Sequence, residues 1–137
     1  MTMQTITVKA SVAAPIEKVW LAYTTPADIM QWNAVSDDWH ATAATVNLSK
    51  AGIFFSRMEA KDGSMGFDFA GTYTRIEPLR LIEYSFGGRS AGVEFTPVQD
   101  GTLISLAFVA EAENPIEQQR SGWQAILDNF ARHAGSR

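Results

Sequence analysis

The chain has 137 residues, which is the size of one domain with a single hydrophobic core. Eleven Lys and Arg residues stand against 15 Asp and Glu residues, so the formal net charge is -4. The basic residues are scattered singly along the chain, so neither nucleic acid nor an anionic membrane surface is an expected partner. The absence of Cys excludes disulfides and thiolate metal sites and fits a reducing compartment, so a cytoplasmic location is expected.

The first third of the chain predicts one strand followed by two short helices. Residues 4–12 alternate between apolar and polar side chains, which is the period of a half-buried strand. Apolar residues then recur at helical spacing after Pro15, and Thr25-Pro26 is a typical start for a second helix. Residues 1–10 do not form a leader, and no window approaches the ~18 apolar residues of a membrane span, so neither export nor anchoring is expected.

From about residue 42 the chain is typical of strands separated by glycine-bearing turns. Asp62-Gly63, Gly87-Gly88 and Asp100-Gly101 supply the positive φ angles that tight hairpins require. The predicted strands are 43–48, 52–61, 66–77, 80–87, 91–98 and 102–111. Together with residues 4–12 they predict a curved antiparallel sheet of about seven strands.

The last element is a long amphipathic helix. Asn114-Pro115-Ile116-Glu117 has the pattern of an N-cap, a first-turn proline and a capping-box acid, and Gly135 is the expected stop. The helix has one apolar stripe that must lie against the sheet. The sequence therefore predicts an α+β fold with residues 1–137 as a single domain, in which the sheet wraps around the C-terminal helix.

Large apolar side chains on the predicted strands share the parity that places them on one face of the sheet. One helix cannot fill the concave side of such a sheet as fully as a second sheet would, so an apolar ligand pocket is expected there. A solid core would give the same alternation, and both interpretations stay open. The expected ligand contacts are Trp39, Phe54, Ser56, Met58, Phe67, Phe69, Tyr73, Tyr84, Phe86, Trp123 and Leu127. Among them, the hydroxyls of Ser56, Tyr73 and Tyr84 are the expected polar handles.

The ionisable residues give only weak candidates for catalysis. Asp37, Asp38 and His40 cluster in a predicted loop, where they could do acid–base work or could simply solvate the loop. Arg57 alternates with Phe54 and Met58 and is therefore expected outside the pocket, unless a bulge re-aims it toward a ligand carboxylate. The chain has two His, so no metal site is predicted, and no motif indicates a cofactor.

Several blocks of sequence resemble the START-like helix-grip superfamily (SRPBCC), in the branch named after the activator of the heat-shock protein 90 ATPase. They are APIEKVW at 14–20, SDDWH at 36–40, SRMEAKDGS at 56–64, GFDF at 66–69, ENP at 113–115 and GWQAILDNF at 122–130. The resemblance implies a deep pocket between sheet and C-terminal helix, which different members use for lipids, sterols, polyketides or hormones. The co-chaperone role in the branch name belongs to larger proteins with an additional N-terminal domain, so the name does not imply that activity for this chain.

Three functions follow from these observations. The first is the binding of a small apolar molecule, since the inward aromatic residues come without a convergent set of ionisable groups. The second is a cyclase-, hydratase- or isomerase-type enzyme, which requires His40 with Asp37 or Asp38 to face a dry pocket. The third is a protein-interaction or chaperone-accessory module, including a homodimer, that uses apolar surface around Trp32 and Trp39. The sequence favours the first function.

Overall fold

Seven antiparallel strands form one curled sheet in the structure, a computed structural model that describes residues 4–137. The strands are β1 (Thr5–Val12), β2 (Trp39–Val46), β3 (Ile53–Ala60), β4 (Gly66–Glu77), β5 (Leu81–Phe86), β6 (Arg89–Val98) and β7 (Gly101–Val109). Their order across the sheet is β1-β7-β6-β5-β4-β3-β2. Strands β2 to β7 therefore form a meander, and β1 pairs with β7. Residues 1–3 of the predicted domain lie outside the described residues.

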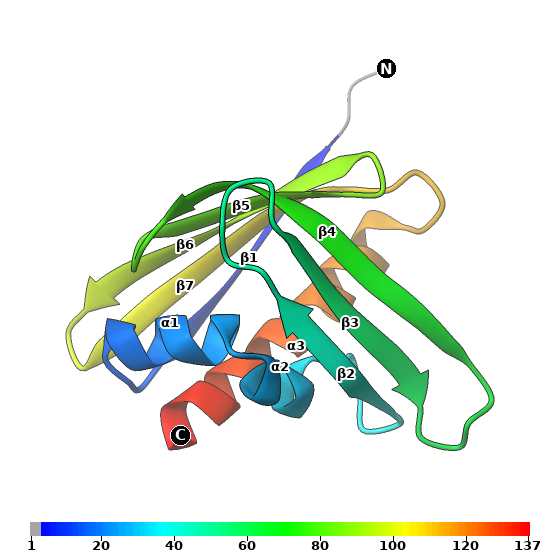
Figure 1. The fold of residues 1–137 in the computed structure, drawn as a ribbon, viewed down its shortest axis with the longest axis horizontal. Coiled ribbons are helices and arrows are strands. Elements are labelled where there is room, and N and C mark those ends of the chain that lie inside the picture. Colours follow the sequence, from blue (N-terminus) through cyan, green and yellow to red (C-terminus); the bar gives the residue numbers. More distant parts are fainter. Residues whose placement is uncertain (1–3) are drawn as a thin grey trace.

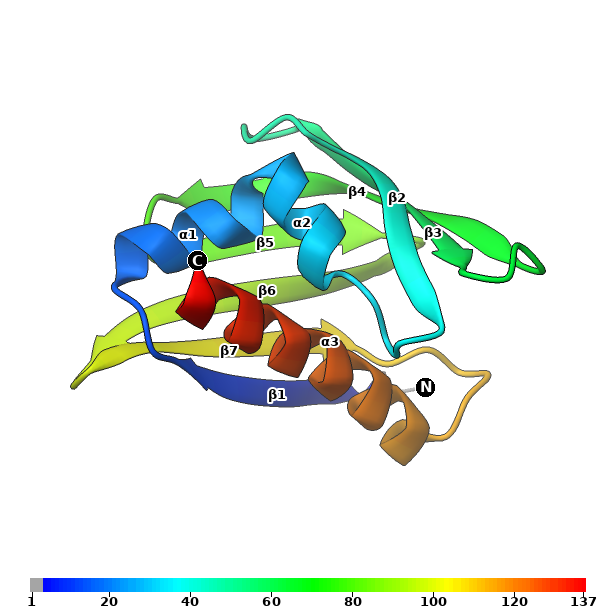
Figure 2. The same ribbon diagram turned by 90° about the horizontal axis from the view of Figure 1, so that it is seen from below.

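Three helices lie on the concave side of this sheet: α1 (Ile16–Thr24), α2 (Pro26–Trp32) and α3 (Ile116–Ser136). The sheet curls over them (Figure 1). Seen from below, α3 runs beneath β1 and β7, with α1 and α2 beside it (Figure 2). This arrangement confirms the predicted α+β helix-grip fold. Within residues 4–137, no helix is long and apolar enough to cross a membrane.

The core lies between the sheet and the buried stripe of α3. Phe130 on α3 is fully buried and makes edge contacts with Trp32 of α2 and Tyr23 of α1, at ring-centroid distances of 5.1 and 5.2 Å. About two helical turns earlier, Trp123 stacks on Phe108 of β7 at 4.1 Å. Burying a large apolar side chain of this kind contributes roughly 1.5–3 kcal/mol. Aromatic packing therefore holds all three helices on the sheet.

The edge strand β1 is covered by polar contacts from α3. Arg120 Nη1 donates to the carbonyl oxygen of Thr7 at 3.2 Å, and Gln124 Nε2 donates to that of Lys9 at 2.9 Å. An edge strand has unpaired backbone groups that can template association with another chain. The polar side of the helix therefore satisfies carbonyls that the sheet leaves unpaired.

The predicted element boundaries are wrong at β2, at α3 and at β6, which begins at Arg89 instead of residue 91. β2 begins at Trp39 instead of residue 43, because Trp39 pairs with Ala60 and the pairing continues past an irregularity between Ala41 and Ala43. This irregularity breaks the apolar alternation that a sequence pattern relies on. At α3 the cap position is Pro115, no side chain caps the helix, and the helix runs through Gly135. The predicted capping box and glycine stop are therefore wrong.

Candidate functional site

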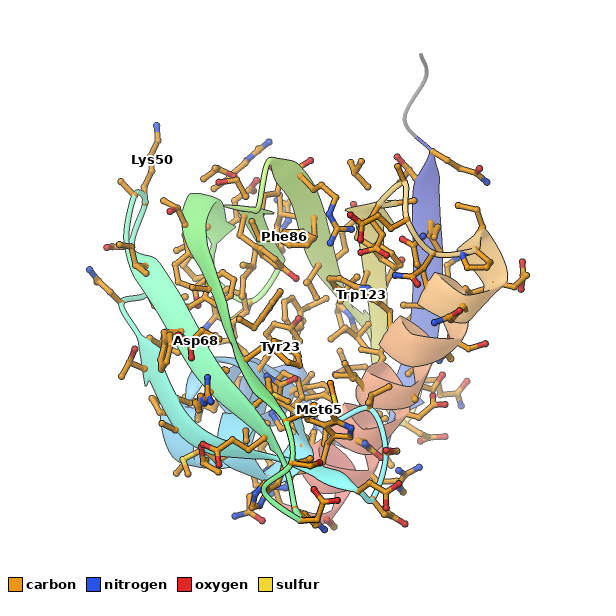
Figure 3. The ribbon with its side chains drawn as sticks, turned by 90° about the vertical axis from the view of Figure 1, so that its right-hand side faces the viewer. Tyr23, Lys50, Met65, Asp68, Phe86 and Trp123 are labelled. Carbon is orange, nitrogen blue, oxygen red and sulfur yellow. The ribbon has the colours of Figure 1, made fainter. Side chains whose placement is uncertain are left out.

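A cavity of about 300 Å3 lies between the sheet, α3 and the two short helices. This volume is at the lower end of the range for small-molecule sites, roughly 300–1,000 Å3. Tyr23 from α1, Phe86 from β5 and Trp123 from α3 point toward the same space, whereas Asp68 of β4 lies on the other face of the sheet (Figure 3). The cavity is therefore built by elements that are far apart in the sequence.

The lining is dominated by aromatic and aliphatic side chains. Rings follow one another along its wall: Phe54 meets Tyr73 at 5.2 Å and Tyr84 at 5.0 Å, and Phe69 meets Phe86 at 5.7 Å. The residues that line the cavity are Tyr23, Ile29, Trp32, Asn33, Thr45, Val46, Phe54, Phe55, Ser56, Met58, Phe67, Phe69, Tyr73, Ile82, Tyr84, Phe86, Arg89, Leu106, Trp123, Ile126 and Leu127. Such a surface suits an apolar molecule.

Three tyrosines belong to the lining of this apolar space. They are Tyr23, Tyr73 and Tyr84. Among the described residues, none of their hydroxyls is completely buried without a hydrogen-bond partner. Burial raises the pKa of Tyr73 to about 12. Burial, together with the neighbouring tyrosines, also raises the pKa values of Tyr23 and Tyr84. The phenols therefore stay neutral at physiological pH and can donate hydrogen bonds to a ligand.

Arg89 is the one charged residue among the described residues that line the cavity. Its guanidinium carbon lies 4.6 Å from the centre of the Phe86 ring, and its Nη1 donates to the carbonyl oxygen of Val109 at 2.9 Å. The lining includes no Asp, Glu, His or Lys. The site thus combines a large apolar surface, neutral hydroxyls and one cation.

The structure places all but one of the predicted ligand contacts in the cavity lining. The ten residues brought together there are Phe54, Ser56, Met58, Phe67, Phe69, Tyr73, Tyr84, Phe86, Trp123 and Leu127. Trp39 is the exception: it lies outside the lining and packs against Phe67 at 5.7 Å. Phe67 is half exposed, so it stands where the cavity meets solvent. The contact of these residues with a ligand stays a prediction.

The weak catalytic candidates do not meet in the cavity. Asp37 and Asp38 are exposed in the turn before β2, and His40 is exposed on β2 opposite Glu59. The predicted loop around His40 is thus wrong, because this residue belongs to the strand. None of the three lines the cavity, so the inward orientation that the enzyme hypothesis requires is not met. Within residues 4–137 no group of three His, Asp or Glu side chains is placed to hold a metal ion.

The outer face of the sheet carries the charges that alternation assigned to it. Arg57 contacts Glu59 at 3.3 Å and Asp68 at 3.1 Å. These pairs are largely exposed, so solvent screens them and they contribute little to stability. The cross-strand charge network is therefore as expected, and Arg57 is engaged there instead of at a ligand.

Sequence reasoning missed eleven residues of the lining, among them the polar residues Arg89 and Tyr23. Arg89 pairs with Phe86 across the β5–β6 hairpin, and paired residues share a face of the sheet. Alternation could have found it, because Ala91, Val93 and Phe95 follow at the same parity and are all buried. Tyr23 lies at the end of the apolar stripe of α1, and only the packing of that helix on the sheet decides whether it faces a core or a cavity.

Comparison with known proteins shows which family has this architecture. Residues 13–135 match the family model described as Activator of Hsp90 ATPase homolog 1-like protein. No curated protein matches the chain. A protein of Chromobacterium violaceum with 20% identity, a TM-score of 0.84 and 96% coverage of both chains shares the fold.

Two solved bacterial structures are more similar in sequence. The AHSA1-like protein from Aeromonas hydrophila is 42% identical with a TM-score of 0.92, over 97% of this chain and 93% of that chain. A protein of Cytophaga hutchinsonii is 46% identical with a TM-score of 0.82, over 96% of this chain and 92% of that chain. The match over nearly the whole chain therefore shows that it belongs to the Activator of Hsp90 ATPase homolog 1-like family.

Proposed function

We propose that this protein binds a small, largely apolar molecule in the cavity between the sheet and α3. The observation that carries the proposal is the cavity itself, whose aromatic wall includes three tyrosines. A solid core would have closed this space, because protein interiors pack to the density of organic crystals. A preformed apolar space with a few polar handles is typical of a ligand site.

The lining favours binding over proton-transfer chemistry. A general acid or base works best with a pKa near the operating pH. The tyrosines of the lining have raised pKa values, and that of Tyr73 is about 12. The exposed positions of Asp37, Asp38 and His40 leave the cavity without a carboxylate or imidazole. The residues present can hold and orient a molecule.

A matched pair of leucine substitutions tests the proposal. Ser56 is buried and lines the cavity from β3, whereas Ser85 is exposed on β5. Ser56→Leu adds apolar volume inside the cavity, and Ser85→Leu adds the same volume outside it. We expect the fluorescent dye 8-anilinonaphthalene-1-sulfonate to bind the native protein and the Ser85→Leu variant alike. We expect Ser56→Leu to weaken binding at least about 10-fold, which corresponds to about 1.4 kcal/mol.

A second measurement identifies the natural occupant. Native and denaturing mass spectra of the protein purified from its host report any small molecule that is released on unfolding. Equal dye binding by all three proteins would indicate a surface site, and no binding together with no co-purifying molecule would contradict the proposal.

The interaction-module alternative depends on a smaller surface than the sequence suggested. Trp32 is buried, and its Nε1 donates to the carbonyl oxygen of Ala22 at 2.9 Å, so it cannot contribute to a patch. Met65 and Phe67 are exposed on the β3–β4 hairpin, and Phe67 packs against Trp39. The same native mass spectra measure whether two copies associate through this hairpin.

A further inference from the structure

The position of Arg89 suggests what kind of molecule the cavity accepts. Arg89 is the first residue of β6, directly after the Gly87-Gly88 turn, and it pairs with Phe86, the last residue of β5. Both side chains line the cavity. The short hairpin therefore holds a cation at the edge of an aromatic wall.

Two contacts fix the Arg89 guanidinium and leave some of its N–H donors available. One nitrogen, Nη1, donates to the carbonyl oxygen of Val109, and the guanidinium stacks on the Phe86 ring. A guanidinium has five N–H donors, so donors on Nε and Nη2 remain. The ion pairs of the described residues use Arg57, Arg75, Arg80, Arg120 and Arg137. Within residues 4–137, Arg89 thus has no carboxylate partner.

The charge of the cavity is opposite to that of the whole protein. The chain carries a formal net charge of -4, yet the described lining contains Arg89 and no carboxylate. A half-buried cation without a counterion is unfavourable unless water hydrates it or a ligand supplies a negative charge. The described lining therefore suits a negatively charged group better than a positively charged one.

The tyrosine hydroxyls are suited to bind the same end of a ligand as Arg89. Burial and the neighbouring Tyr73 raise the pKa of Tyr84, and the positive charge of Arg89 offsets part of this effect. The Tyr84 ring packs against Phe86 at a centroid distance of 5.6 Å, and Arg89 lies over that same Phe86 ring. A neutral phenol donates a hydrogen bond, and donors of both kinds suit an anionic oxygen. Hydrogen bonds to a charged group are about twice as strong as neutral ones.

We infer that the ligand is a small amphipathic carboxylic acid, whose carboxylate lies against Arg89 and whose compact apolar body lies on the aromatic wall. This inference rests on the proposed function. A carboxylate matches the planar guanidinium and brings the single negative charge that one cation balances. The cavity has room for a molecule on the order of ten to twenty non-hydrogen atoms.

Three probes with one apolar body and different charges test this inference on the full-length protein. Naphthalene-2-carboxylate is the anion, 2-naphthylmethanol the neutral analogue and 2-naphthylmethylammonium the cation, each titrated calorimetrically. We expect the native protein to bind the anion at least about 10-fold more tightly than either analogue. We expect Arg89→Gln to remove this preference while the affinity for the alcohol changes less than about 2-fold.

Matched variants separate the charge from a structural role of Arg89. Arg57→Gln removes an arginine from the outer face and should leave all three affinities unchanged. Arg89→Lys keeps the charge without the planar fork, so part of the preference should remain. The comparison of the three probes on the native protein needs no variant, so the inference stays testable if an Arg89 variant fails to fold.

The outcomes distinguish this inference from the proposed function. Equal binding of the three probes to the native protein overturns the inference and leaves the proposed function standing. Equal weakening of acid and alcohol by Arg89→Gln also overturns it, because the arginine would then act only on the shape of the cavity. If neither the probes nor the fluorescent dye bind, the proposed function fails and the inference fails with it.

Discussion

The Nε2 atom of His133, near the end of α3, lies 2.7 Å from a carboxylate oxygen of Asp28 in the first turn of α2. The same oxygen accepts a hydrogen bond from Arg137 Nε at 2.9 Å. Asp28 is buried, with 9% of its surface exposed. Burial raises its pKa, but the hydrogen bonds from Arg137 and His133 outweigh this effect and the net pKa lies below its usual value. This contact joins the C-terminal end of α3 to the short helix that borders the cavity.

Replacing Asp28 by Asn should destabilise the protein by about 1–3 kcal/mol. The substitution removes the buried negative charge that accepts hydrogen bonds from both His133 and Arg137. Asp28 has a lowered pKa in the folded state, so its stabilisation is present above the unfolded pKa of about 3.9 and is lost as the pH falls through the folded value. Urea unfolding at pH 7 and at pH 3 measures this effect. The difference in free energy of unfolding between the native protein and the Asp28→Asn variant should be smaller at pH 3 than at pH 7.

The control for this substitution is Asp37→Asn, in the exposed turn before β2. We expect its free energy of unfolding to stay within about 0.5 kcal/mol of the native value. A loss as large as that of Asp28→Asn would mean that removal of any carboxylate, and not the contact with α3, causes the effect.

The same phenylalanine-to-alanine change should act differently at two positions. Phe130→Ala should cost about 3–5 kcal/mol, because Phe130 is fully buried between α1 and α2. Phe67→Ala should cost less than about 1 kcal/mol, since 50% of Phe67 is exposed. Phe67 lines the cavity, so its removal should nevertheless weaken dye binding. Urea unfolding and dye titration of both variants separate the two effects, and equal stability losses would contradict the assignment of Phe67 to the cavity opening.

Alternation predicted the inward face of the sheet wherever the strands are regular. Phe67, Phe69 and Tyr73 lie on β4, whose predicted range of 66–77 matches the structure. The pattern was uninformative at β2, where small residues and the irregularity after Ala41 hide the period. A strand face is a local property of the backbone, and it can be derived from sequence for as long as the period holds.

The shape and charge of the cavity depend on contacts that no local pattern encodes. Tyr23 reaches the cavity because α1 packs on the sheet. Trp39 stays outside the lining and packs against Phe67. Arg89 was missed because the predicted strand began two residues too late, at 91 instead of 89. An error in one strand boundary thus hid the charged residue of the lining.

All three tyrosines of the chain should titrate above their ordinary value in the folded protein, because burial raises the pKa of each. The folded protein keeps these protons at pH values where the unfolded chain has lost them. The corresponding stabilisation is therefore complete below the unfolded pKa of about 10 and is lost as the pH rises toward the folded values. Ultraviolet absorbance at about pH 10.5 should show little tyrosinate in native protein and a majority in urea-unfolded protein. Similar tyrosinate fractions in both would contradict the burial of the phenols.

Two strand glycines should respond in opposite ways to alanine. A Cβ atom on Gly71 of β4 would lie 2.5 Å from the Phe54 ring and 2.7 Å from the carbonyl oxygen of Ser85. Gly71→Ala should therefore destabilise the protein by about 1–3 kcal/mol and push Phe54 into the cavity, which weakens dye binding. A Cβ atom on Gly92 of β6 would meet its first neighbour, Glu83, at 3.6 Å.

This second distance is an ordinary van der Waals contact, so Gly92→Ala should leave dye binding unchanged. It should stabilise the protein by up to about 1 kcal/mol, because alanine reduces the conformational entropy of the unfolded chain. Urea unfolding and dye titration of both variants check the pair. Phe54 and Gly71 face each other across β3 and β4. If Gly71→Ala leaves dye affinity unchanged while it lowers stability, the Phe54 ring has moved away from the cavity, and Phe54 does not limit the space available to the ligand.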